Sequence, residues 1–386
     1  MISRICKWIV FKCIYPLVYF IGKCRRVDND RIIFVETHGD TLSDNYGMLF
    51  QEVSERGYQP QVYYLKVSES AWGKIIIKTI RLIWDMSIAK CVFLNESNSA
   101  FGAFDLRKET QLVQLWHACG AFKRWGYSVA EKHFGDDKQT LDKYSGHRNY
   151  TLVSVSGEAV CWAYEEAFGL ERVSDVVKAL GVSRTDVFFS EERKMQAYDA
   201  LQRYDRTELG DKLQGRKIIL YAPTFRGDIR GAKSPDKLDL DKLSDIRKEY
   251  VVLVKQHPFV KEPFAVPEEY RDFCIEVGSD LSTEELLMVS DVCVTDYSSI
   301  VFEYSLMKKP ILFFAYDLDE YYDERGFYYP YEEFVPGPIV KTTEELVSCI
   351  KCLDDYDMDR LERFSQQYMS GCDGHSTERI VEYVLK

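Results

Sequence analysis

Short apolar runs alternate with longer amphipathic segments along most of the chain. In the first half, the pattern predicts strands at Arg31–Glu36, Gln61–Leu65, Cys91–Leu94, Gln111–Trp116 and Thr151–Val155. Between them it predicts helices at Asn45–Arg56, Ala71–Ser87 and Gly157–Phe168. Strand-to-helix alternation of this kind is typical of parallel sheets built from βαβ units.

A second series of the same kind follows. Its predicted strands are Lys217–Tyr221, Tyr250–Lys255, Phe273–Glu276, Asp291–Thr295 and Pro310–Phe314. Its predicted helices lie near Glu191–Tyr204, Leu240–Lys248, Thr283–Ser290, Ser299–Met307 and Glu344–Leu353, with a last helix from Ser376. Because the strands read as continuous apolar runs, helices should cover both faces of each sheet.

Two series predict an α/β protein with two doubly wound, Rossmann-like domains that face each other across a central cleft. We assign residues 28–187 to the N-terminal domain and 188–370 to the C-terminal domain. Residues 371–386 form a C-terminal helix that is a candidate to cross back to the first domain. The length of 386 residues agrees with two domains.

Residues 1–27 differ from the rest, because they carry six basic residues before Val27 and no acid before Asp28. At about 100° per residue, one side carries basic and aromatic residues, namely Arg4, Lys7, Trp8, Lys12, Tyr15, Tyr19 and Lys23. The other side is apolar, with Ile5, Ile9, Val10, Cys13, Leu17, Phe20 and Ile21. This division predicts an amphipathic helix at a membrane surface. A helix packed on the protein's own body is the alternative.

A spanning helix is disfavoured because Lys7 and Lys12 interrupt a stretch that would need roughly 20 apolar residues. A cleaved signal peptide would need a small-residue cleavage site, which this stretch lacks. The protein is therefore predicted to lie peripherally on the cytoplasmic face of the cell membrane. Its eleven scattered cysteines agree with a reducing compartment.

The net charge of −12 and the lack of a basic stripe in the globular part argue against a nucleic-acid partner. A zinc-like spacing occurs once, as Cys349-x-x-Cys352 followed by Cys372-x-x-His375. We interpret it instead as an amphipathic helix followed by a turn into the last helix. No metal site and no cofactor are therefore predicted.

Ligands of open α/β sheets bind beyond the carboxyl ends of the strands. His117 follows the run Gln111–Trp116, and Gly120 and Lys123 come soon after it, which suits a base beside an anion. Thr224 and Arg226 project past Lys217–Tyr221 in the same way. Lys255 and His257 end the strand that begins at Tyr250, where Pro258 closes it.

The surplus of polar groups after Asp291–Thr295 points to a ligand. Asp296, Ser298 and Ser299 stand where a helix begins, and one hydroxyl would suffice as its cap. Free amide groups at a helix start bind phosphate, and Glu303, one turn later, could accept ribose hydroxyls. We expect a nucleotide diphosphate here. The missing glycines exclude a P-loop or a G-x-G-x-x-G site.

The segments QLWHACGAFK, YAPTFR, VKQHPF, DVCVTDYSSIVFEYSLMKKPILFFAYDLDEYYDERGFYY and VPGPIV resemble the CDP-glycerol glycerophosphotransferase family. This family contains the primases and polymerases of wall teichoic acid and related capsule polymers. The likeness runs from about Gln111 to the C-terminus. It is weaker before Gln111, where TLSDNYGMLF stands in place of a comparable acidic loop and makes Asp44 a candidate.

The resemblance implies a GT-B fold, with the acceptor on the N-terminal domain and the CDP-polyol on the C-terminal domain. It implies two essential histidines, His117 and His257. It also places donor-binding residues at Arg226, Lys255, Ser298, Ser299 and Glu303. Their places beyond strand ends add Thr224 and Asp296 on the donor side, and Asp44, Gly120 and Lys123 as acceptor-side candidates.

The sequence departs from the family at the first histidine. Much of the family has W-H-G-T-P-x-K, whereas this chain has Trp116-His117-Ala-Cys-Gly-Ala-Phe-Lys123, a variant similar to that of ribitol-phosphate transferases. CDP-glycerol and CDP-ribitol therefore both stay open as donors. The stretch Tyr127–Tyr150, with His133 and His147, is a candidate to shape the acceptor site.

The hypothesis is transfer of a polyol phosphate from a CDP-polyol to a hydroxyl of an acceptor, with release of CMP. The acceptor would be an undecaprenyl-diphosphate-linked saccharide or polyol phosphate at the cytoplasmic membrane surface. His117 would be the general base, and His257 would stabilise or protonate the leaving phosphate. The alternatives are a nucleotide-sugar glycosyltransferase, a UDP-sugar epimerase of similar architecture, and a non-catalytic membrane-bound scaffold.

Overall fold

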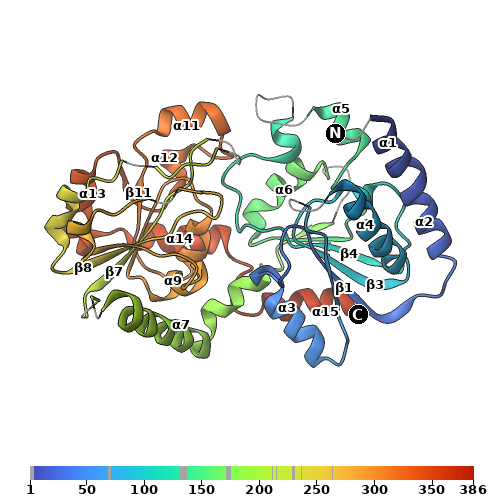
Figure 1. Cartoon of the computed structure of the whole chain (residues 1–386), viewed down its shortest axis with the longest axis horizontal. Helices are drawn as coiled ribbons and strands as arrows, with labels where there is room; N and C mark the ends of the chain where they lie inside the picture. The colour runs from blue at the N-terminus through green and yellow to red at the C-terminus, as the bar shows by residue number, and fades with distance from the viewer. Residues whose placement is uncertain are drawn as a thin grey trace. The chain divides into compact units, whose positions relative to one another are not determined.

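The computed structural model describes residues 4–67, 71–130, 137–170, 175–210, 212–213, 215–227, 231–235, 237–262 and 264–386. The chain divides into two compact units (Figure 1). The first comprises Met1–Gly120, Arg124–Val187 and Ser370–Lys386, and the second comprises Ala121–Lys123 and Phe188–Met369. The chain thus leaves the first unit for three residues at Ala121–Lys123 and returns to it for its last segment.

Six parallel strands form the sheet of the first unit, in the spatial order β2-β1-β3-β4-β5-β6. Their bounds are β1 (Asp28–Glu36), β2 (Gln61–Tyr64), β3 (Ala89–Leu94), β4 (Gln111–Gln114), β5 (Leu152–Ser154) and β6 (Val177–Lys178). The chain builds outward from β1 in one direction with β2 and in the other with β3. The switch point of this sheet therefore lies between β1 and β3.

The first unit also contains helices and 3-10 turns. After the N-terminal segment they are α3 (Asp44–Glu55), α4 (Trp72–Met86), α5 (Lys138–Lys143), α6 (Cys161–Phe168) and α15 (Ser376–Leu385), with 3-10 turns at Ser99–Gly102, Gly126–Val129, Glu158–Val160 and Ser183–Phe189. Although α15 is last in the sequence, it lies beside α3 (Figure 1). Its Ile380, Val381 and Val384 join Phe34 and Phe93 in the core.

The N-terminal helix is continuous but not uniform. It consists of α1 (Arg4–Ile9), a π-helical turn at Val10–Ile14, and α2 (Tyr15–Gly22). Tyr15 and Tyr19, which the 100° periodicity places with the basic residues, are buried instead. The ring of Tyr19 stacks on Phe104 with centroids 4.1 Å apart. The periodicity fails because the π-helical turn holds more residues than an α-helical turn, so later residues are rotated.

The opposite face of this helix is apolar and exposed. It carries Ile5, Trp8, Ile9, Leu17, Phe20 and Ile21, with Ile5 70% exposed and Phe20 60% exposed. By length and composition alone, Arg4–Gly22 is long and apolar enough to cross a membrane. Gly22 allows a close approach to the body, because a Cβ there would lie 2.3 Å from the Ser87 hydroxyl. The helix is thus docked by one face and leaves its apolar face uncovered.

The second unit also contains six parallel strands, in the order β12-β11-β10-β7-β8-β9. Their bounds are β7 (Lys217–Ala222), β8 (Tyr250–Val254), β9 (Cys274–Glu276), β10 (Val292–Thr295), β11 (Ile311–Phe314) and β12 (Ile339–Val340). Strands β7 to β9 run outward in one direction, and β10 returns to pair with the other side of β7. This is the order of dinucleotide-binding folds, with its switch point between β7 and β10.

The helices of the second unit are α7 (Glu191–Tyr204), α8 (Leu240–Leu243), α9 (Thr283–Val289), α10 (Ile300–Ser305), α11 (Leu318–Arg325), α12 (Tyr331–Phe334), α13 (Thr343–Lys351) and α14 (Met358–Tyr368). A π-helical turn at Asp205–Leu209 and 3-10 turns at Ser244–Ile246, Glu268–Tyr270 and Leu353–Asp355 complete the set. Two helices begin with a capping box written in the sequence. Ser282 pairs with Glu285 before α9, and Thr342 pairs with Glu345 before α13.

The predicted α/β class with two parallel, doubly wound sheets is confirmed. All ten predicted strands are present within a few residues of their predicted bounds. The pattern missed β6 and β12, because each has only two residues and shows no period. It also made the helix at Ser299–Met307 too long, since α10 covers Ile300–Ser305.

Candidate functional site

The switch point of the first unit is tied together by a buried carboxylate. Glu36 ends β1 and is only 4% exposed. One of its carboxylate oxygens accepts the Ser43 backbone N–H at 2.6 Å, and the other accepts the Asn95 amide at 3.2 Å. Since Asn95 follows β3, this carboxylate links the ends of the two strands that flank the switch point.

His117 lies at the same edge, after β4. Its Nδ1 is 3.0 Å from a carboxylate oxygen of Glu96, the residue after Asn95. Because a carboxylate only accepts hydrogen bonds, in the neutral ring Nδ1 carries the proton and Nε2 presents a lone pair. The His117 side chain is 45% exposed, which leaves this lone pair within reach of a substrate. Sequence reasoning missed Glu96, although its place directly past an apolar strand end was a usable signal.

The backbone before His117 adopts an uncommon conformation. Trp116 has φ = 57°, in the left-handed region that a bulky residue rarely occupies. Its ring lies 4.3 Å from the His117 imidazole and packs against Phe168 at 5.2 Å. Such strain persists where surrounding contacts hold it, often at functional sites. The Trp116 ring therefore fixes the plane of the imidazole.

The other acceptor-side candidates have different surroundings. Asp44 is exposed at the first position of α3. Gly120 is buried, and both of its backbone groups are used, by the Ser156 hydroxyl and by the Tyr164 hydroxyl, each at 3.0 Å. Lys123 groups with the second unit. Asp44 thus lies at the surface where α3 begins, whereas Gly120 is fixed within the loop that follows His117.

His147 is a core residue. Its ring stacks on Phe168 at 4.2 Å, and its Nδ1 lies 3.2 Å from the Tyr150 hydroxyl. Burial lowers the pKa of His147 to about 4, so it stays neutral at physiological pH. His133, the other histidine of the predicted acceptor loop, lies outside the described residues.

At the switch point of the second unit, Asp296 joins the ends of β7 and β10. Its Oδ1 accepts the Thr224 backbone N–H at 2.8 Å and the Tyr297 backbone N–H at 2.6 Å. The Thr224 hydroxyl is buried and has no hydrogen-bond partner among the described residues. A buried polar atom of this kind marks a place for a water or a ligand.

Arg226 follows the same strand, and carboxylates and aromatic rings surround its guanidinium group. It forms two hydrogen bonds with Asp317, at 2.6 and 2.9 Å, and an ion pair with Asp296 at 3.0 Å. The hydroxyl of Tyr297 donates to Asp317 at 2.8 Å. The guanidinium charge is therefore matched by two carboxylates of this unit. Asp317 was missed because it follows β11 without any motif of its own.

His257 lies after β8 with the opposite hydrogen-bond pattern to His117. Its Nδ1 accepts the Phe259 backbone N–H at 3.2 Å, so in the neutral ring the proton is on Nε2. The rings of Phe225 and Phe259 lie 4.9 and 4.7 Å away. Burial, with the Lys123 ammonium as the second cause, lowers the pKa of His257 below its ordinary value. His257 is thus a neutral hydrogen-bond donor.

Lys255 holds a loop. Its ammonium donates to the backbone carbonyls of Gly278 and Leu281 at 2.5 and 2.7 Å. Burial lowers the pKa of Lys255. The loop that it holds follows β9, so Lys255 fixes the neighbouring strand end of the same sheet.

The segment after β10 forms a turn before α10. Ser298 Oγ accepts the Ile300 backbone N–H at 3.4 Å, and Ser299 stands at the cap position without a capping bond from its hydroxyl. The Ser299 hydroxyl is therefore not used for the helix. Glu303 is 7% exposed and faces the interior. Glu303 is therefore a buried acid and not a solvent-exposed one.

The two halves of the zinc-like pattern lie in different units. Cys349 and Cys352 belong to the second unit, and Cys372 and His375 belong to the first. Among the described residues, no three His, Cys, Asp or Glu side chains are grouped so as to hold a metal ion.

Two doubly wound parallel sheets, each with a histidine beyond its carboxyl edge, give this chain a GT-B-like fold. The family model of CDP-glycerol:poly(glycerophosphate) glycerophosphotransferase matches residues 17–386, and the chain belongs to this family. The predicted family is thereby confirmed.

Named relatives and a solved structure agree with this membership. The chain is 34% identical to the teichoic acid ribitol-phosphate primase of Bacillus spizizenii, over 93% of this chain and 91% of the primase. It is also 34% identical to the teichoic acid poly(ribitol-phosphate) polymerase of the same organism, over 96% of this chain but only 59% of the polymerase. The structure of the wall teichoic acid polymerase TagF has the same fold, with a TM-score of 0.73 at 22% identity, over 98% of this chain and 94% of that one.

Proposed function

We propose that this protein transfers glycerol phosphate or ribitol phosphate from a CDP-polyol to a hydroxyl of a lipid-linked acceptor in teichoic acid or related polymer synthesis. The family and the named relatives support the reaction class. Enzymes named for ribitol phosphate and for glycerol phosphate are both similar to this chain, so CDP-ribitol and CDP-glycerol are both proposed as donors.

The observation that carries the proposal is the Glu96–His117 pair. The acceptor hydroxyl forms a bond to the phosphorus that bears the polyol, and the bond from that phosphorus to the bridging oxygen of CMP breaks. His117 Nε2 takes the hydroxyl proton as general base. Glu96 holds the proton on Nδ1 and stabilises the imidazolium that forms, because its carboxylate lies 3.0 Å away.

On the donor side, His257 supplies a hydrogen bond. Its neutral ring carries the proton on Nε2, and its lowered pKa keeps it neutral. It therefore suits a donor to a phosphate oxygen of the leaving CMP, where fixed donors lower the barrier. The switch point beside it, with Thr224, Asp296, Ser298 and Ser299, is the proposed nucleotide site.

Arg226, Lys255 and Glu303 belong to this donor region in a supporting role. Arg226 binds Asp296 and Asp317, and Lys255 binds two loop carbonyls. We propose that these two cations hold the strand ends in register for the nucleotide. Glu303 is buried on α10 and is the proposed partner of ribose hydroxyls after α10 adjusts to the donor.

Peripheral attachment to the cytoplasmic membrane surface is proposed from the uncovered apolar face of Arg4–Gly22. Replacing Leu17 and Phe20 with Asp should release the protein from vesicles that contain anionic lipid. Replacing Met195, which is also exposed but lies on α7, should not. If both variants sediment like the wild type, the helix is not the attachment site.

CMP release tests the reaction. Wild type and His257→Ala are each supplied with CDP-glycerol or CDP-ribitol and a lipid-linked glycerol-phosphate disaccharide primer. Release from one donor that is greatly reduced in the variant would establish the reaction and name the polyol. No release from either donor, with turnover of UDP-sugars instead, would move the chain to the nucleotide-sugar alternatives.

A further inference from the structure

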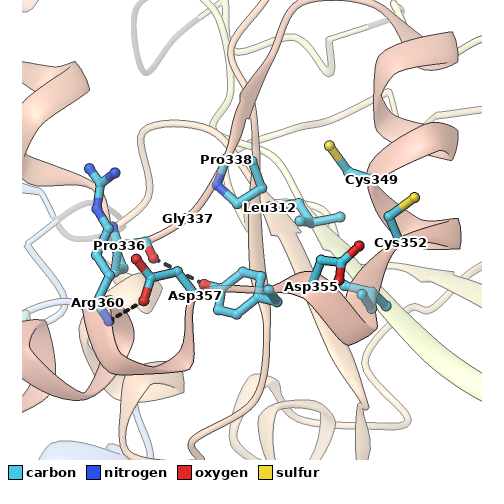
Figure 2. Close-up of a pocket in the computed structure, with 11 residues that line it drawn as sticks. Leu312, Pro336, Gly337, Pro338, Cys349, Cys352, Asp355, Asp357 and Arg360 are labelled. Atoms are coloured by element: carbon cyan, nitrogen blue, oxygen red, sulfur yellow. Dashed lines mark hydrogen bonds between the residues drawn. The ribbon is translucent and has the colours of Figure 1, made fainter.

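A pocket of about 350 Å³ lies in the second unit (Figure 2). Leu312, near the start of β11, forms part of its wall, and Pro336–Pro338 form another part just before β12. Since all strands of this sheet are parallel, the pocket lies toward their amino ends. It is therefore separate from the proposed nucleotide site.

The pocket is held open by fixed contacts. The Tyr356 hydroxyl accepts the Ile311 backbone N–H at 3.2 Å and lies 3.1 Å from the Pro336 carbonyl. A Cβ at Gly337 would lie 2.0 Å from the Ile311 carbonyl oxygen, so only glycine fits there. These contacts fix the loop and the segment after α13 on the same strand, so the pocket is preformed.

Two thiols line this pocket, Cys349 near the end of α13 and Cys352 at its C-cap (Figure 2). Residues three apart on a helix face the same side, with Cα atoms about 5 Å apart, which is within the range that a disulfide can bridge. Cys349 is half-buried and packs against the core, whereas Cys352 is exposed. The pair thus combines an accessible thiol with a fixed neighbour.

We infer that Cys349 and Cys352 form a dithiol site that a low-molecular-weight disulfide oxidises to an intramolecular disulfide. The Cys352 thiolate attacks the small disulfide, forms a mixed disulfide and releases one small thiolate. The Cys349 thiolate then attacks the Cys352 sulfur and releases the second small thiolate. Two protein thiols are oxidised, their two protons go to solvent, and one small disulfide is reduced to two thiols.

The environments of the two thiols set this order. Burial, with Cys352 and Glu345 as further causes, raises the pKa of Cys349, so Cys349 is the poorer first attacker. Its fixed position suits the second, intramolecular step instead. Burial also raises the pKa of Cys274, to about 12, and buried thiols of this kind are inert toward such reagents.

Other exposed cysteines serve as internal comparators. Cys6 and Cys13 are both exposed but lie seven residues apart on the N-terminal helix. Their axial separation of about 10 Å exceeds the span of a disulfide. An oxidant that modifies them should leave two mixed disulfides and no bridge.

The test treats the folded full-length protein with oxidised glutathione, blocks the remaining thiols by alkylation, and maps peptides by mass spectrometry. The expected result is a Cys349–Cys352 bridge together with glutathione on Cys6 and Cys13. In Cys349→Ser, glutathione should stay on Cys352. In Cys352→Ser, Cys349 should stay alkylated.

The wild-type map decides the question even if a variant folds poorly. Glutathione retained on Cys352 beside an alkylated Cys349 would show that the pair does not close. An unmodified pair beside glutathionylated Cys6 and Cys13 would show that the pocket thiols do not react. Either result overturns the inference.

Discussion

His117 and His257 hold matching places in two similar sheets, yet they present opposite hydrogen-bonding groups. Each follows the strand next to a switch point, β4 beside β3 in one unit and β8 beside β7 in the other. The Nδ1 of His117 donates to a carboxylate, whereas the Nδ1 of His257 accepts a backbone N–H. In the reaction that we propose, one ring therefore serves as the general base and the other as a hydrogen-bond donor to a phosphate oxygen.

The switch points of the two units also differ in how their charged groups are arranged. In the first unit, a single acid, Glu36, accepts hydrogen bonds from an amide and a backbone N–H, and His117 beside it is 45% exposed. In the second unit, Arg226 is matched by two carboxylates inside a group of tyrosines. The edge of the first unit, where we propose that the acceptor binds, is therefore open around His117, whereas the proposed donor edge of the second unit is fixed by buried charge.

The largest expected effect comes from removing the base. His117→Ala should lower kcat for CMP release by about 10²- to 10⁴-fold, the usual contribution of a general base. Binding of the CDP-polyol, measured by calorimetry, should change little. His375 is the matched control, since it is an exposed histidine 3.6 Å from Glu378, and His375→Ala should keep full activity. Near-normal turnover of His117→Ala would show that His117 is not the general base.

Removing the central cation of the donor edge should cost stability. Arg226→Met leaves Asp296, whose side chain is 3% exposed, and Asp317 without their partner. Breaking a buried pair in this way costs about 3–5 kcal/mol of unfolding free energy. Urea unfolding measures the change, with Lys351→Met as the control because its pair with Asp245 is exposed. Equal small losses in the two variants would mean that buried charge does not fix this edge.

Glu96→Gln sharpens the contrast at the acceptor edge. A hydrogen bond to a charged group contributes about 1.5–3 kcal/mol, so kcat should fall by about 10- to 100-fold. KM for the donor should stay the same, because Glu96 holds only the base. The control is Glu158→Gln on a surface turn, which should leave kcat unchanged. Asn95→Gln is unsuitable as a control because the Asn95 amide donates to Glu36. A loss confined to KM would contradict the role of Glu96.

The smallest expected effect is a shift in the pKa of His257 when Lys123 is replaced. The pKa of His257 in the folded protein lies below its value in the unfolded chain. The folded protein is therefore more stable above the unfolded pKa, where the ring is neutral. This extra stability is lost as the pH falls through the folded pKa. Lys123→Gln removes the second cause and should raise the pKa of His257, while burial still keeps it below its ordinary value. Titration of the ring protons by NMR measures the shift, with Lys242→Gln as a surface control. An unchanged titration would exclude Lys123 as a cause.

The sequence predicted the strands of both sheets because buried parallel strands read as continuous apolar runs. It also placed His117, Thr224, His257 and Asp296 just past strand ends. It did not find Glu96 or Asp317, because their roles depend on partners from another strand. Lys123 is an acceptor-side candidate because it follows His117 closely in sequence, and this role stays a prediction; that Ala121–Lys123 groups with the second unit was not visible in the sequence. Side-chain pairing between strands is a tertiary property that periodicity does not encode.

The π-helical turn at Val10–Ile14 records the equivalent of one inserted residue in an otherwise regular α-helix. It sets the angle about the helix axis between Arg4–Ile9 and the following segment, which Tyr15 and Tyr19 anchor to the rest of the unit. Because the wider π-helical turn takes up the inserted residue, deleting a single residue from it would restore α-helical spacing and leave Arg4–Ile9 on nearly the same face, with the docked segment in place. The turn thus lets the helix carry one more residue between its exposed beginning and its docked end without changing the side that Trp8 presents.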